Sequence, residues 1–205
     1  MLSTRTVPPT FTYRPNFITA EEEERLLAKV ASAPQPKWTT LKNRRLQNWG
    51  ATPIAAKNNV ALPEKLPDWL APLADRIAAE VDSAFVFDGT KYGIMPHLDG
   101  PAYRPTVATV SLGEYCILEF YKRRNLDEVM VTGEHDDADS QTIRPTPDFR
   151  FLIQPRSLVM LQDEMYEGYL HGIGETWEDR QNSRVSLTFR VAAKVSKLNL
   201  FGKKR

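Results

Sequence analysis

Two stretches within the first 84 residues have apolar positions at helical spacing. Thr19-Ala-Glu-Glu22 is typical of a capping box, and an apolar stripe follows it, so we expect a helix that begins after Thr19 and ends before Pro34. A second helix is expected after Pro67, with its regular part beginning at Pro72. Between them, residues 34–66 contain several prolines and mixed charge, which indicates irregular chain with short strands.

From about residue 85 the pattern changes to short runs of β-branched and aromatic residues separated by turn residues. The expected strands cover residues 106–112, 115–121, 149–153, 157–162, 166–171 and 184–193. Consecutive strands without intervening helices favour an antiparallel sandwich or barrel. Residues 125–147 are acidic and poor in apolar residues, and we expect a surface loop there.

The last expected strand alternates strictly between polar and apolar residues. Its polar face carries Arg184, Ser186, Thr188 and Arg190. Two arginines that point into a barrel are costly unless they meet an anion, and a guanidinium pairs with a carboxylate through two hydrogen bonds. A keto-dicarboxylic acid would therefore suit this face. The alternative is that the face is exposed to solvent and that the arginines only add solubility.

Candidate metal ligands are few, because the chain has three histidines and one cysteine. His97 and Asp99 are two positions apart, so in an extended segment both side chains point to one face. His171, at the end of an expected strand, would complete a site of two histidines and one carboxylate, which is the ligand set of non-heme iron(II) oxygenases. His135 and Asp137 form a second His-x-Asp pair in the acidic stretch, and isolated histidines are often core or surface residues.

Composition limits the class of protein further. The 205 residues, 41% of them hydrophobic, suit one folded domain, and 27 basic against 26 acidic residues give no overall attraction to nucleic acid. The single Cys116 excludes an internal disulfide and a multi-cysteine zinc site. The polar N-terminus lacks a signal-peptide pattern, and no stretch has the ~20 apolar residues of a membrane span. We expect a soluble protein of the cytoplasm, the nucleus or both, with no membrane partner.

The order His97-x-Asp99, His171, Arg184, Arg190 resembles the AlkB family of iron(II)- and 2-oxoglutarate-dependent dioxygenases. Five further stretches are similar to one branch of that family, the sixth of the eukaryotic AlkB homologues. They are residues 37–38, 45–50, 93–101, 155–158 and 170–173, and the resemblance as a whole covers about residues 11–195. The resemblance implies a mainly β fold with flanking N-terminal helices, a double-stranded β-helix of the jelly-roll or cupin-like class.

The resemblance also implies how the chain is divided. One dioxygenase domain would cover residues 1–205. Within it, residues 11–84 would form a helical and lid extension, residues 85–195 the β-helix core, and residues 196–205 a basic tail.

The same resemblance implies roles for the polar residues. His97, Asp99 and His171 would bind iron(II), and molecular oxygen would be the co-substrate. Arg184 would bind the distal carboxylate of 2-oxoglutarate, whereas Arg190 would bind the carboxylate nearer the metal and steady Asp99. The implied reaction is hydroxylation or oxidative dealkylation of a substrate.

The remaining family assignments concern the pocket walls and the lid. Ser186 and Thr188 would add hydrogen bonds to 2-oxoglutarate. Arg45, Gln47 and Trp49 lie where the family carries its substrate-recognition lid, so they would contact a nucleic-acid or protein substrate. For Trp49, ordinary packing of a loop on the core is the alternative to stacking on a base.

One departure from the family pattern affects the pocket. The family places an Asn-x-Tyr strand before the His-x-Asp turn, whereas residues 87–94 here run almost directly into that turn, with Tyr92 in part of the position. One wall of the 2-oxoglutarate pocket is therefore in doubt. The alternative function is a catalytically impaired form that binds nucleic acid or a partner protein through Arg44, Arg45, Trp49 and the basic tail.

Overall fold

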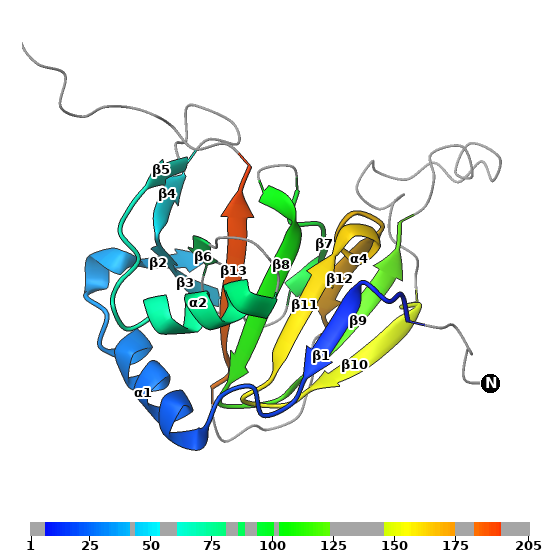
Figure 1. Cartoon of the computed structure of the whole chain (residues 1–205). Coiled ribbons are helices and arrows are strands. Elements are labelled where there is room, and N and C mark those ends of the chain that lie inside the picture. The colour runs from blue at the N-terminus through cyan, green and yellow to red at the C-terminus, as the bar shows by residue number, and fades with distance from the viewer. Residues whose placement is uncertain are drawn as a thin grey trace, which may run out of the picture.

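Two antiparallel β-sheets face each other in the computed structural model, and two helices cover the outer face of the larger sheet (Figure 1). The structure describes residues 7–41, 44–53, 61–80, 86–88, 94–100, 103–123, 146–174 and 183–193. This arrangement confirms the predicted mainly β, jelly-roll class with flanking N-terminal helices.

The larger sheet has seven strands. Their order across the sheet is β1 (Phe11–Arg14), β11 (Leu158–Gln162), β8 (Tyr103–Leu112), β13 (Val185–Ala192), β6 (Val86–Asp88), β3 (Arg44–Trp49) and β2 (Trp38–Leu41). Three of these strands, β1, β2 and β3, come from the predicted N-terminal extension. The extension therefore adds strands to the sheet that carries the core, in addition to its helices.

The smaller sheet has four strands and closes the other side of the barrel. Their order is β10 (Phe149–Ile153), β9 (Cys116–Lys122), β12 (Tyr169–Ile173) and β7 (Ile94–His97). A separate pair is formed by β4 (Ala51–Pro53) and β5 (Ala61–Pro63), and a short 3-10 helix, η1 (Gln35–Lys37), precedes β2.

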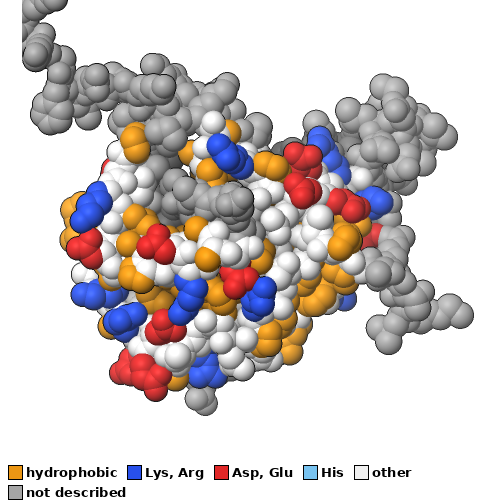
Figure 2. All heavy atoms as spheres, in the orientation of Figure 1, with side chains coloured by type: hydrophobic (Ala, Val, Ile, Leu, Met, Phe, Trp, Pro, Cys, Tyr) orange, Lys and Arg blue, Asp and Glu red, His pale blue; other side chains and the backbone are white. Residues whose placement is uncertain are grey.

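Both N-terminal helices begin where the sequence predicts. In α1 (Ala20–Ala31), the Thr19 hydroxyl accepts a hydrogen bond from the Glu22 amide, and the Glu22 carboxylate accepts one from the Thr19 amide. The second helix, α2 (Ala71–Glu80), has Pro72 in its first turn, where a missing amide hydrogen costs little. Among the described residues, no helix is long and apolar enough to cross a membrane. Acidic and basic side chains are interspersed on the helix-covered face (Figure 2).

The core has two layers, which follow from the alternation of side chains along the strands. One layer lies between the helices and the larger sheet and includes Leu26, Ile77, Leu187 and Phe189. The other lies between the two sheets and includes many aromatic rings, such as Phe120. Because β13 contributes Leu187 and Phe189 to the outer layer, its alternate residues point into the barrel.

The expected strand over residues 166–171 is partly wrong. Residues 163–167 form a short helix, α4 (Asp163–Glu167), and the strand begins at Tyr169. The consecutive side chains of Met165 and Tyr166 are both buried in this helical turn. The other expected strands agree with the structure within a few residues at their ends.

The strand that the family pattern places before the His-x-Asp turn is replaced in part by the short β6. Its three residues pair with Thr188, Phe189 and Arg190 of β13 on one side, and its last two pair with β3 on the other. The Asn-x-Tyr pair is absent, as the sequence indicates, and three residues of β13 pair with β6 at this place. Tyr92, residues 125–145 of the acidic stretch predicted over 125–147, and the basic tail lie outside the described residues.

Candidate metal centre

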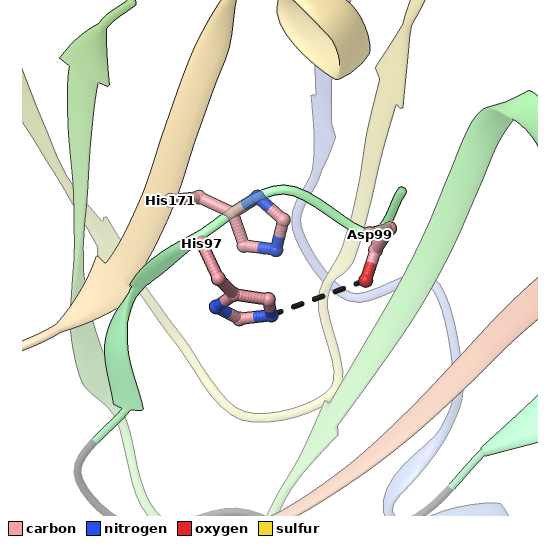
Figure 3. A group of neighbouring side chains, drawn as sticks. All are labelled: His97, Asp99 and His171. Carbon is pink, nitrogen blue, oxygen red and sulfur yellow. Dashed lines mark ion pairs between the residues drawn. The ribbon is translucent and has the colours of Figure 1, made fainter. Parts of the chain in front are cut away.

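The three predicted ligands, His97, Asp99 and His171, lie close together between the two sheets (Figure 3). His97 ends β7 and pairs across the sheet with His171 of β12, so the two imidazoles lie side by side with ring centroids 4.7 Å apart. Asp99 follows in the turn after β7, and one donor atom from each residue lies within 4.8 Å of the other two. The second pair, His135 and Asp137, lies outside the described residues.

A buried ion pair fixes the orientation of Asp99. Nη2 of Arg190 lies 2.6 Å from Oδ1 of Asp99, and both side chains are about 5% exposed. The same oxygen is 4.0 Å from Nε2 of His97. Because a buried carboxylate is unfavourable without a compensating charge, Arg190 supplies that charge and holds Asp99 beside the two histidines.

The turn that carries Asp99 is held by a residue that the sequence analysis misses. Gly100 adopts a positive φ of 79°, and its carbonyl accepts a 2.9 Å hydrogen bond from the Tyr166 hydroxyl of α4. Burial, with a smaller contribution from the nearby Asp99 carboxylate, raises the pKa of Tyr166, so the hydroxyl remains a donor over the physiological range. No local sequence signal marks Tyr166, because the contact joins residues 66 positions apart.

The predicted polar face of β13 lines a cavity between the two sheets. The lining residues are Val107, Thr109 and Ser111 of β8, Leu118, Ile153, Val159, Leu161, His171 and Ile173 from the neighbouring strands, and Arg184, Ser186, Thr188 and Arg190. Arg184 is 6% exposed and Arg190 is 4% exposed. The alternative of a solvent-exposed, solubilising face is therefore wrong.

Strand β8 supplies polar partners for this face. Ser111 accepts a 2.9 Å hydrogen bond from Arg184, and the Thr109 and Thr188 hydroxyls are 3.3 Å apart. The sequence carries a signal for these residues, since Thr109 and Ser111 are two positions apart and alternate with the apolar Ala108, Val110 and Leu112. Gly113 follows this strand and has a φ of 77°. A Cβ at this position would lie 2.3 Å from the Ser183 carbonyl oxygen, so only glycine lets the backbone at 113 come this close to the backbone at 183, next to Arg184.

The predicted lid residues on β3 are arranged differently from the expectation. Gln47 is 1% exposed, and its amide donates to the Val30 carbonyl of α1 at 2.9 Å and accepts from the Trp49 indole at 3.0 Å. Trp49 packs edge-on against Trp69, with ring centroids 5.8 Å apart. Direct substrate contact by Gln47 does not fit this burial, and the packing alternative describes Trp49. Arg45 is exposed, and its guanidinium lies 4.5 Å from the centre of the Trp38 ring.

The pairing of three strands shows which side of β3 faces the barrel interior. Position 48 pairs with position 88 of β6, which in turn pairs with Thr188. Residues directly opposite one another in antiparallel strands share a face, so Asn48 lies on the cavity face of the sheet with Thr188. Gln47 and Trp49 lie on the other face, with the helices.

We expect replacement of Gln47 by alanine to destabilise the protein rather than to alter the metal centre. The change removes partners from the buried Val30 carbonyl and from the Trp49 indole, at a cost of about 1–3 kcal/mol in the free energy of unfolding. Urea unfolding measures this loss. Arg45→Ala, an exposed neighbour on the same strand, is the control and should stay within about 0.5 kcal/mol of the wild type. Equal stability of Gln47→Ala and Arg45→Ala would contradict the assigned role.

The donor set indicates which metal the centre suits. Two imidazoles and one carboxylate on adjacent backbone segments form a facial set that leaves other coordination positions open, as in non-heme iron(II) oxygenases. The two buried arginines beside it suit a doubly charged organic anion. The residues present therefore fit iron(II) and a dicarboxylate.

Comparisons with known proteins agree with this geometry. No protein-family model matches the chain. A zebrafish (Danio rerio) protein named "Probable RNA/DNA demethylase ALKBH6" is 39% identical over 228 residues, which cover 96% of this chain and 92% of the relative. The alignment is 228 residues long, whereas 96% of this chain is only about 197 residues. The aligned part of the relative therefore includes segments that have no counterpart in this chain.

Solved structures show the same fold at low sequence identity. OsALKBH1 has a TM-score of 0.55 and 11% identity, covering 91% of this chain and all of the other. HygX from Streptomyces hygroscopicus, with nickel and 2-oxoglutarate bound, has a TM-score of 0.54 and 16% identity, covering 89% of this chain and 83% of HygX. With the similarity to the zebrafish protein over nearly the full length, the chain belongs to the AlkB family of iron(II)- and 2-oxoglutarate-dependent dioxygenases.

Proposed function

We propose that this chain oxidatively removes an alkyl group from a nucleic-acid base, with His97, Asp99 and His171 as the iron(II) ligands. The convergence of these three side chains at the end of a cavity lined by buried arginines carries the proposal. The name of the zebrafish relative, which describes a probable RNA/DNA demethylase, supports the nucleic-acid substrate. We place the reaction in the cytoplasm, the nucleus or both, where such substrates occur.

Arg184, which directly precedes β13, and Arg190 of β13 take separate roles in this proposal. Arg184 lies at the end of the polar face away from Asp99 and binds the distal carboxylate of 2-oxoglutarate, with Ser111 holding its guanidinium. Arg190 holds Asp99 and would bind the 2-oxoglutarate carboxylate nearer the metal. Ser186 and Thr188, between them on the same face, add hydrogen bonds. Iron(II) supplies the activation of oxygen for oxidation of a C–H bond.

The opposite wall of the cavity contributes by excluding water. Leu118, Ile153 and Ile173 come from three strands of the smaller sheet and present apolar side chains toward the polar face of β13. A site with a charged wall and an apolar wall orients a dicarboxylate and strengthens its ion pairs, because few waters compete for them.

The test is a coupled assay with alkylated substrate. For an N-methyl base, one oxygen molecule and one 2-oxoglutarate should yield the unmethylated base, formaldehyde, succinate and carbon dioxide. We expect formaldehyde and succinate to form in equal amounts with a single-stranded oligonucleotide that carries an N-methylated base, and no formaldehyde with the unmethylated oligonucleotide. Formaldehyde is measured by derivatisation and succinate by mass spectrometry.

An iron titration separates a disabled pocket from a wrong substrate. Iron(II) and 2-oxoglutarate added without oxygen should produce a weak visible charge-transfer band at one equivalent of each. A folded protein that binds the oligonucleotide but shows neither this band nor formaldehyde would instead be the catalytically impaired, nucleic-acid-binding form. A band without formaldehyde on any alkylated oligonucleotide would contradict the substrate and retain the cofactors.

A further inference from the structure

A second cavity lies beside the metal turn and outside the barrel cavity. It has a volume of about 320 Å³, within the usual range for small-molecule sites. Its lining residues are Leu98, Gly100, Tyr103, Pro105, Arg123, Tyr166 and Glu167. Leu98 and Gly100 are the immediate neighbours of Asp99, whereas His171 lines the barrel cavity. An occupant of the second cavity would therefore sit next to the metal ligands and not on their donor atoms.

Two aromatic residues and a proline give this cavity flat apolar walls. Tyr166 is 7% exposed, and its hydrogen bond to the Gly100 carbonyl holds the ring in one position. The guanidinium of Arg190 lies 5.5 Å from the centre of the Tyr103 ring. Rings fixed in this way form a stacking surface for another planar group, and base–aromatic stacking is largely independent of base identity.

Among the residues that line this cavity, Arg123 is the basic one and Glu167 the acidic one, so Arg123 is the group that can bind a phosphate. Arg123 follows the end of β9 and is exposed, and its amide donates to the Gly168 carbonyl between α4 and β12 at 2.8 Å. This hydrogen bond anchors the backbone of Arg123 at the cavity while the side chain remains accessible to solvent. A guanidinium at the mouth of an aromatic cavity is a common arrangement for binding one phosphate of a stacked nucleotide.

We propose that the second cavity binds a nucleotide adjacent to the reacting one, with its base against Tyr103 and Tyr166 and its phosphate at Arg123. This inference rests on the proposed nucleic-acid substrate. Gly100, which follows Asp99, and Arg123, which follows β9, would then help to hold the nucleic-acid strand. The barrel cavity alone offers no site for a second nucleotide. Single-stranded nucleic acid is the expected ligand, because its bases are free to stack.

The test measures binding of a fluorescein-labelled single-stranded octanucleotide to the anaerobic protein loaded with iron(II) and 2-oxoglutarate. Arg123→Gln should weaken binding by about five- to tenfold and reduce the slope of log affinity against log salt by about one. Lys122→Gln is the matched control, since Lys122 is the preceding residue, is also exposed and is not among the lining residues. It should change affinity less than twofold.

Stacking is tested separately with 2-aminopurine in the octanucleotide, whose fluorescence falls when the base stacks on an aromatic ring. We expect the wild type to quench 2-aminopurine at a position next to the reacting base, and Tyr103→Leu to lose this quenching. The charge-transfer band of iron(II) and 2-oxoglutarate should persist in Tyr103→Leu, which shows that the metal centre beside it is intact.

The outcomes distinguish this inference from the proposed function. Equal weakening by Arg123→Gln and Lys122→Gln would show only general charge attraction and overturn the second site, even if formaldehyde is still produced. Quenching that persists in Tyr103→Leu would also overturn it. A wild type that neither binds the octanucleotide nor releases formaldehyde from any alkylated strand would contradict the nucleic-acid substrate itself.

Discussion

Replacing His97 with alanine is expected to abolish stoichiometric iron(II) binding. The side chain is one of three donors that lie within 4.8 Å of one another, and a facial site that loses one imidazole retains only two protein ligands. We expect the dissociation constant for iron(II) to rise by a factor of about 100 or more, as loss of a metal ligand or its supporting partner commonly does. Anaerobic titration followed by the charge-transfer band and by metal analysis measures this change.

The matched control for His97→Ala is His135→Ala, since His135 begins the other His-x-Asp pair in the chain. It should bind iron(II) as the wild type does. Full iron occupancy in His97→Ala, combined with its loss in His135→Ala, would show that the ligands have been assigned to the wrong pair. Thermal unfolding of both variants should accompany the titration, so that a loss of fold is not mistaken for a loss of ligand.

Replacing Arg184 with alanine is expected to weaken 2-oxoglutarate binding by about 10- to 100-fold while iron(II) affinity stays within a few-fold. Arg184 is buried at the far end of the polar face, where its guanidinium can pair with a carboxylate shielded from water. Charged hydrogen bonds of this kind contribute about 1.5–3 kcal/mol. Isothermal titration with 2-oxoglutarate, using manganese(II) in place of iron to avoid oxidation, gives the co-substrate affinity, and anaerobic titration with iron(II) gives the metal affinity.

Arg150→Ala is the control for the loss of a guanidinium. Arg150 is 60% exposed at the side chain and pairs with Glu119 on the smaller sheet, and it is not among the residues that line the barrel cavity. It should leave 2-oxoglutarate affinity unchanged. If Arg184→Ala lowered iron(II) and 2-oxoglutarate affinity by the same factor, Arg184 would support the metal centre and the co-substrate would bind elsewhere.

Local patterns in the sequence predict much of this fold because the signals themselves are local. The capping box at Thr19 and Glu22 involves residues three positions apart, and both hydrogen bonds form as expected. The alternation of Arg184, Ser186, Thr188 and Arg190 predicts a shared face, and all four residues line one cavity. The ligand prediction likewise uses the two-residue spacing of His97 and Asp99.

The features that sequence reasoning misplaces depend on partners distant along the chain. Gln47 and Trp49 are two positions apart on β3 and share a face, but only the pairing of β3 with β6 and of β6 with β13 shows that this face meets the helices. Tyr166 is similar, because its role comes from a contact with Gly100. The division of the chain at residue 85 stays a prediction, although β1, β2 and β3 join the larger sheet.

The burial of both faces of β13 limits how the length of this chain can change during evolution. A single inserted or deleted residue between Arg184 and Arg190 would turn one arginine into the layer that holds Leu187 and Phe189, and an apolar side chain into the charged cavity. A charged side chain would then be buried among apolar ones, and an apolar side chain would replace a charged one in the cavity. Insertions and deletions should therefore accumulate in the connections between strands, while the six-residue interval between the two arginines stays constant among functional descendants.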